Sequence, residues 1–276
     1  MALLARASPA RRRGRLSVRQ AVLLGLIQGP AEVLPVSSSG HLVLVPALRG
    51  WPYARLPADV RKAFEVALHT GAGVALAWLL RNDVVAAAKD PVGTTLLAGP
   101  ASAVAFALEP MIEEHLSSAR IAAVAQVVAG ATLLAADAVP ASQGVTPRHA
   151  GDMLVVGLAQ AAALVPGVSR NGATFTAARA LRFDREAAVR LSWRAGLPII
   201  GGATLLKVIR VRQSGLPPEL RAPFAAGAAA AFASTLAARP LLRVRGQRVT
   251  AAYRIALGAF ALRRLGRRNR LEWLRG

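Results

Sequence analysis

The chain alternates between long apolar stretches and short polar segments that contain proline, glycine or arginine. Six stretches predict helices that cross a lipid bilayer, because about 17 helical residues extend roughly 26 Å and nearly span the hydrocarbon core. They are residues 64–80, 92–108, 119–137, 187–209, 221–238 and 248–263. Between them we expect an interfacial loop at 50–62, a polar loop at 82–91 and an acidic turn at Glu109, Glu113 and Glu114.

Two further apolar stretches, residues 17–49 and 151–182, are interrupted in the middle by polar residues, proline and glycine. Non-helical backbone at membrane depth is costly unless protein buries it or it lines a cavity. Each stretch therefore predicts a re-entrant hairpin, in which one helix enters the membrane and a second helix returns.

The two hairpins are copies of one unit. A shift of 132 positions superposes four polar or glycine positions. The matched pairs are Gly25 and Gly157, Gln28 and Gln160, Ser37 and Ser169, and Gly40 and Gly172. Alanine and leucine are common in this chain, so the Gly, Gln and Ser matches carry the argument.

The order of the elements predicts an all-α integral membrane protein built as an inverted repeat. Each unit has one hairpin and three spans. Because three crossings is an odd number, the second unit begins on the opposite face of the membrane from the first. The hairpin tips, residues 35–41 and 166–172, should then meet. We expect a basic tail at 1–16, one membrane domain at 17–265 (repeat 1 about 17–137, repeat 2 about 151–265) and a basic tail at 266–276.

Composition agrees with a membrane protein and excludes several classes of enzyme. The chain is 54% hydrophobic, its mean hydropathy is +0.41 and its net charge is +21. The arginines lie at the ends and between apolar stretches, as in loops of membrane proteins, so we expect no nucleic-acid partner. Cysteine is absent, which excludes thiol chemistry. The four histidines form no HExxH motif, which argues against a zinc hydrolase.

The residues of the two breaks carry a family resemblance. QGPAEVLPVSSSGH resembles the (E/Q)xxxE-plus-SSxGH segment of the BacA-type undecaprenyl pyrophosphate phosphatases, and VPGVSRNGAT resembles the family's PGxSRSxxT segment. The resemblance covers about residues 17–265. One departure is Asn171, which stands where the family usually has Ser.

The resemblance implies a phosphatase of the plasma (inner) membrane with a long-chain polyprenyl diphosphate as its lipid substrate. The enzyme would release inorganic phosphate and recycle the carrier lipid for cell-wall synthesis, with its active site facing outside. A homodimer is compatible with this reading. The rival hypothesis is a flippase or transporter of the same lipid phosphate, because inverted repeats with broken helices are typical of transporters.

Arg170 is the first candidate for substrate binding. An isolated arginine in the hydrocarbon is costly, so it should face a cavity, and its planar guanidinium matches phosphate. The alternative is an arginine that reaches the membrane surface. Neighbouring hydroxyl, amide and backbone groups could complete a phosphate cradle: Gly167, Ser169, Asn171, Gly172 and Thr174.

Glu32 is the carboxylate inside the first hairpin, and Gln28 precedes it by one helical turn. Next to a diphosphate they could bind a divalent cation, Mg²⁺ or Ca²⁺, because both ions prefer oxygen ligands. The alternative is that Glu32 forms an ion pair with Arg170 for structural reasons alone.

The serines after Pro35 have two readings. Ser37, Ser38 and Ser39 could cap the returning helix, and with Gly40 they could bind substrate. A serine nucleophile needs a neighbouring base, and the resemblance favours Ser38 with His41 as that pair.

His69, His115 and His149 lie outside the motifs and are expected to be structural. The role of Arg194, in the middle of a predicted span, stays open.

Overall fold

A computed structural model describes residues 16–142, 149–214 and 217–273. Only the backbone is described for residues 109, 110, 113, 203–214 and 268–273. Within these ranges the regular structure is entirely helical. In the first half, the elements are α1 (Val18–Val33), α2 (Ser38–Arg49), η2 (Pro52–Arg55), α3 (Ala58–Leu79), α4 (Arg81–Lys89), α5 (Pro91–His115) and α6 (Ala119–Ala138). In the second half, they are α7 (Ala150–Ala159), η3 (Gln160–Leu164), α8 (Arg170–Ala180), α9 (Arg185–Ser214), α10 (Pro218–Ala237), η4 (Arg239–Arg243) and α11 (Arg248–Trp273).

The first predicted hairpin is formed by α1 and α2. Helix α1 ends before Leu34, whose backbone is extended, as expected for the residue that precedes a proline. Ser37 has a φ of 69°, and its side chain accepts a hydrogen bond from Gly40 N, which caps α2. Local chemistry therefore both ends α1 and starts α2 within four residues.

The second hairpin repeats this construction with α7, η3 and α8. Ser169 has a φ of 66°, and its side chain accepts a hydrogen bond from Gly172 N. Gly167 has a φ of 103°, a conformation that favours glycine. The two breaks therefore have the same cap, 132 residues apart.

Several predicted loops are helical. Helix α3 begins at Ala58, inside the predicted interfacial loop, and α4 occupies the predicted polar loop, at 83° to α3. Helix α5 runs to His115 through the predicted acidic turn, and α11 runs to Trp273 through most of the predicted C-terminal tail. Alanine, arginine and glutamate have high helix propensity, so a polar segment rich in these residues can continue a helix.

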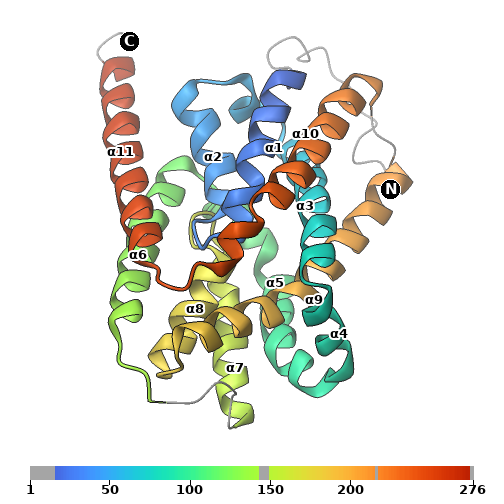
Figure 1. Cartoon of the computed structure of the whole chain (residues 1–276). Helices are drawn as coiled ribbons and strands as arrows, with labels where there is room; N and C mark the ends of the chain where they lie inside the picture. Colours follow the sequence, from blue (N-terminus) through green and yellow to red (C-terminus); the bar gives the residue numbers. More distant parts are fainter. Residues whose placement is uncertain (1–15, 143–148, 215–216, 274–276) are drawn as a thin grey trace.

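The hairpins lie between two groups of long helices (Figure 1). Helices α6 and α11 pack together on one side, and α3, α9 and α10 lie on the other. The contacts of the first half are repeated in the second. Helix α1 packs on α10, and its counterpart α7 packs on α5. Helix α3 also packs on α10, and its counterpart α9 packs on α5. Close approach depends on glycine, since a Cβ at Gly25 would overlap Gly227 of α10 and one at Gly157 would overlap Leu96 of α5.

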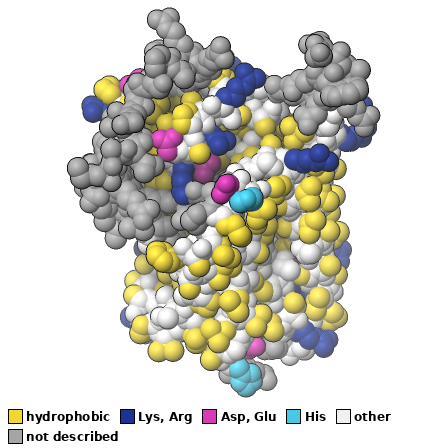
Figure 2. Space-filling view, turned by 180° about the vertical axis from the view of Figure 1, so that it is seen from behind, with side chains coloured by type: hydrophobic (Ala, Val, Ile, Leu, Met, Phe, Trp, Pro, Cys, Tyr) yellow, Lys and Arg dark blue, Asp and Glu magenta, His cyan; other side chains and the backbone are white. Residues whose placement is uncertain are grey.

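The protein is an all-α membrane protein. Among the described residues, two helical segments have the length and composition to cross a membrane, Pro91–Leu108 and Ala119–Ala138, and the bent pair of α3 and α4 is a third if it forms one span. Large apolar side chains on the outside include Val74, Trp78 and Phe106. Figure 2 shows hydrophobic side chains over much of one face.

Candidate active site

The two hairpin tips are in direct contact, as the sequence predicts. Ser37 Oγ accepts a hydrogen bond from Gly167 N at 3.1 Å. Asn171 Nδ2 donates to the backbone carbonyl of Glu32 at 2.9 Å. These contacts join residues 130 and 139 positions apart in the chain, so the tips form one unit.

On one side of this unit, Gln126 of α6 and Arg254 of α11 hold the tip backbones. Arg254 is completely buried and donates to the carbonyls of Pro35, Gly167 and Val168 at 2.6 to 2.9 Å. Gln126 Nε2 donates to Val36 O at 2.8 Å. The sequence prediction missed both residues, although an arginine inside an apolar span is itself a signal of function.

On the other side, Glu32 gathers four polar side chains. Its Oε2 accepts a hydrogen bond from Ser38 Oγ at 2.7 Å and from Gln28 Nε2 at 3.2 Å. Its Oε1 lies 3.4 Å from Arg170 Nη2, and its Oε2 lies 3.5 Å from His69 Nδ1. The carboxylate is buried, and the donors Ser38, Gln28 and Arg170 compensate for its lost hydration.

His69 was expected to be structural, and the structure places it at this site instead. It lies on α3 with a side chain 35% exposed, and its Nδ1 accepts from Gln28 Nε2 at 3.1 Å. Sequence motifs give no signal for this contact because α3 is a separate element. His69 therefore completes the group around Glu32.

Arg170 is the first residue of α8 and lies against Gly196 of α9. A Cβ at Gly196 would overlap the guanidinium, so glycine creates the space that Arg170 occupies. The Nη1 atom of Arg170 is buried and has no hydrogen-bond partner among the described residues. Arginine thus meets Glu32 through one nitrogen and keeps further donors for an anion.

The resemblance pairs Ser38 with His41, but the described contacts pair Ser38 with Glu32. His41 Nδ1 donates to Ser37 O at 2.7 Å, and His41 Nε2 accepts from the Tyr253 hydroxyl at 2.7 Å. The rings of His41 and Tyr253 are stacked, with centroids 5.7 Å apart. The turn of α2 between the two residues directs Ser38 towards α1 and His41 towards α11.

The other predicted cradle residues lie at the tips, but several are already engaged. Ser37 Oγ is 3.3 Å from Ser39 Oγ in addition to its contact with Gly167. Thr174 is fully buried and donates to Ser192 Oγ at 2.8 Å or to carbonyls of its own helix. The Thr174 hydroxyl therefore joins α8 to α9 and is already engaged.

The closest-approach positions at the tips are glycines. A Cβ at Gly40 would lie 2.9 Å from Gln126 Nε2, and one at Gly172 would lie 2.7 Å from Arg254 Nη1. A Cβ at either position would force the end of the Gln126 or Arg254 side chain to shift. The two glycines therefore allow α6 and α11 to reach the tips.

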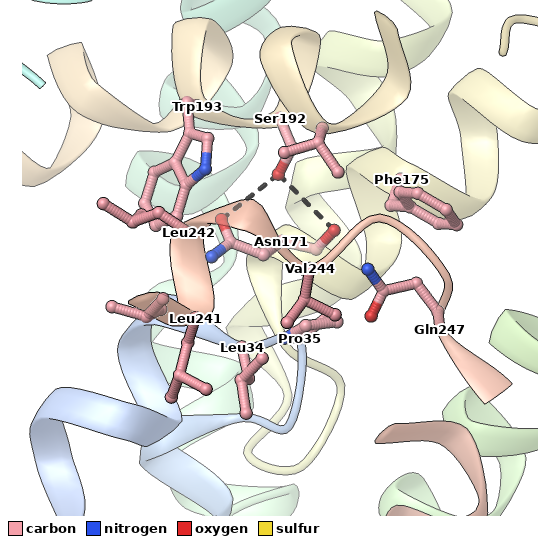
Figure 3. Close-up of a pocket in the computed structure, with 12 residues that line it drawn as sticks. Leu34, Pro35, Asn171, Phe175, Ser192, Trp193, Leu241, Leu242, Val244 and Gln247 are labelled. Atoms are coloured by element: carbon pink, nitrogen blue, oxygen red, sulfur yellow. Dashed lines mark hydrogen bonds between the residues drawn. The ribbon is translucent and has the colours of Figure 1, made fainter. Parts of the chain in front are cut away.

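A mainly apolar pocket lies beside the tips and not at Glu32 (Figure 3). Its walls come from the first break (Leu34, Pro35), from α9 (Trp193) and from the α10–α11 connection (Leu241, Leu242). Asn171 also lines it, with its Oδ1 accepting from Ser192 Oγ at 3.2 Å. Glu32, Ser38 and Arg170 do not line this pocket.

Charged residues outside the tips form structural pairs. Arg194, whose role the sequence leaves open, forms an ion pair with Asp90 at the start of α5, and α9 passes through it without a break. Arg185 forms an ion pair with Asp137 at 2.7 Å. Among the described residues, no group of three His, Cys, Asp or Glu could hold a metal ion.

Residues 21–260 match the family model described as bacitracin resistance protein BacA. An undecaprenyl-diphosphatase of Geotalea daltonii is 36% identical over 269 residues, 88% of this chain and 96% of the relative. One of Thermomicrobium roseum is 37% identical over 281 residues, 90% and 98% of the two chains. One of Pelotomaculum thermopropionicum is 40% identical over 206 residues, 70% and 76%.

Proposed function

The chain belongs to the BacA family of bacitracin resistance proteins, and from that premise we propose that it is an undecaprenyl-diphosphatase. It hydrolyses a polyprenyl diphosphate to the monophosphate and inorganic phosphate. The observation that carries this assignment is the hydrogen bond of 2.7 Å from Ser38 to Glu32, beside the guanidinium of Arg170. The hydroxyl of Ser38, the carboxylate of Glu32 and the guanidinium of Arg170, a group suited to phosphate, therefore lie together.

In the proposed reaction, Ser38 Oγ attacks the terminal phosphorus and its proton passes to Glu32. The bond between that phosphorus and the bridging oxygen breaks, and the lipid leaves as the monophosphate. Water then hydrolyses the phosphoserine and releases inorganic phosphate. Arg170 stabilises charge on the transferred group, which is the main requirement of phosphoryl transfer. The alternative is direct attack by water, with Ser38 as a phosphate ligand.

A divalent cation, Mg²⁺ or Ca²⁺, is part of the proposal. Two hard oxygen donors fit it: the carboxylate of Glu32 and Oε1 of Gln28, which is buried without a partner among the described residues. Such ions are commonly held by one or two protein groups together with substrate phosphates. When bound, the ion neutralises charge on the diphosphate.

We also propose the membrane topology: six spans and two re-entrant hairpins, related as inverted repeats. Two observations support this topology. Ser37 and Ser169 cap their helices with the same side-chain hydrogen bond, and corresponding helices of the two halves make corresponding contacts. The start of α1 and the end of α11 lie at the same end of the molecule in Figure 1, as six crossings require. The enzyme would lie in the plasma membrane and recycle carrier lipid for cell-wall synthesis, with its site open to the outside.

The rival is a flippase of the same lipid phosphate, which the broken helices favour. A carrier needs Arg170 but has no use for a serine bonded to a carboxylate. The test is phosphate release from undecaprenyl diphosphate by the purified chain in detergent, where no gradient exists. Release supports the phosphatase, and binding without release contradicts it.

A further inference from the structure

Arg254 is a buried arginine whose partners are mainly backbone carbonyls. Its Nε donates to Gln126 Oε1 at 3.0 Å, Nη1 to Pro35 O at 2.8 Å, and Nη2 to Gly167 O at 2.6 Å and Val168 O at 2.9 Å. It forms no ion pair with a carboxylate among the described residues. One side chain thus binds both hairpin tips.

These hydrogen bonds fix the direction of two peptide groups. The Val36 carbonyl points to Gln126 and the Val168 carbonyl points to Arg254. In a planar trans peptide, the N–H points away from the C=O, so the N–H groups of Ser37 and Ser169 point away from α6 and α11. No acceptor for either N–H is found among the described residues.

The opposite side of the tips carries the reacting side chains. Glu32 faces His69 of α3, and Arg170 lies against Gly196 of α9. Helices α3 and α9 are on the other side of the hairpins from α6 and α11 (Figure 1). The two N–H groups therefore point to the side of the molecule where Glu32 and Arg170 lie.

We propose that Arg254, together with Gln126, is a positioning residue that directs the N–H groups of Ser37 and Ser169 at the phosphoryl oxygens in the transition state. Each repeat then supplies one backbone donor, and the pair stabilises the charge that develops during transfer. The inference rests on the proposed phosphatase function. It explains why a buried charged side chain has three backbone carbonyls and one side-chain amide as its partners, and no carboxylate among the described residues.

The test uses the purified full chain with undecaprenyl diphosphate and three variants. Gln126→Ala removes the donor to Val36, Arg254→Lys removes the planar fork, and Arg263→Gln is a matched control on the exposed part of α11. We expect kcat to fall ~10²–10³-fold in the first two variants, as for a lost oxyanion donor, with KM within about twofold. The inhibition constant of vanadate, a mimic of the transferred phosphoryl group, should rise with the loss of kcat.

The outcomes separate this inference from the function on which it rests. A wild-type chain that releases no phosphate refutes the proposed function. An active wild type with an unchanged kcat in Gln126→Ala overturns the inference, and this variant decides the matter if Arg254→Lys does not fold. A lower kcat with unchanged vanadate inhibition also overturns it, because general disorder would then explain the loss.

Discussion

Ser37 and Ser169 are 132 residues apart, yet both adopt a left-handed backbone and cap their own helix with the same side-chain hydrogen bond. Ser37 also accepts a hydrogen bond from Gly167, two residues before Ser169. The two equivalent turns are therefore packed against each other. The residue after each serine differs: Ser38 is bonded to Glu32, and Arg170 meets the same carboxylate. A repeated backbone thus presents two different chemistries to one site.

Gly196→Ala should lower activity by displacing Arg170. The added Cβ would overlap the guanidinium, which is the flexible end of a side chain and can move. We expect a loss of ~10²-fold or more in phosphate release, within the range for one lost charge-stabilising donor. Gly201→Ala is the control on the same helix, because a Cβ there meets nothing within 4 Å. Equal activity of the two variants would contradict this role of Gly196.

Arg170→Ala should lose at least ~10²–10³ in rate, because a preorganised donor to the transition state is gone. Arg170→Lys should recover little, since lysine lacks the planar fork that matches phosphate. Steady-state hydrolysis by each variant measures this. Arg190→Ala, an exposed arginine paired with Glu186, is the control. A lysine variant near the wild-type rate would show that only the charge matters.

Removal of divalent cations should abolish turnover, and Mg²⁺ or Ca²⁺ should restore it. Glu32→Gln should raise the cation concentration needed or abolish activity, because one anionic oxygen ligand is lost. The measurement is phosphate release as a function of added cation after chelation. Full activity in excess EDTA would remove the cation from the mechanism.

Ser38→Ala decides between covalent catalysis and direct attack by water. If Ser38 is the nucleophile, its alanine variant should be inactive while diphosphate still binds through Arg170. If Ser38 is only a ligand, the loss should be about 1.5–3 kcal/mol, or roughly ten- to a hundredfold. Acid quench of a single turnover with labelled substrate tests this. Label on Ser38 supports the covalent route, and retained turnover in the alanine variant excludes it.

The chain contains no cysteine, so single cysteines can report topology without background. Arg49→Cys, at the end of α2, and Ser142→Cys, after α6, both lie on the surface. Three spans separate them in the proposed topology, so an impermeant thiol reagent should label only one of them in sealed vesicles. Both should react after permeabilisation. Labelling of both from one side would refute the inverted repeat.

Much of the architecture could be predicted because it is encoded locally. Pro35, the capping serines and Gly167 interrupt the apolar stretches at fixed places, and each acts through its own backbone or its immediate neighbours. The repeat at one offset then predicts that the tips meet, and they do. Local signals are weaker at polar helix ends: the sequence alone predicts a polar loop where α4 lies, an acidic turn at the end of α5 and a basic tail at the end of α11.

Tertiary structure decided which side chains form the site. Ser38 and His41 are neighbours in the motif, yet one turns to Glu32 and the other to Tyr253, 212 residues away. His69 and Arg254 carry no motif and reach the tips only because α3 and α11 pack on opposite sides of the hairpins. Sequence determines where a helix breaks, since a break depends on near neighbours. The partner of a side chain depends on distances between helices, which packing of the whole chain sets.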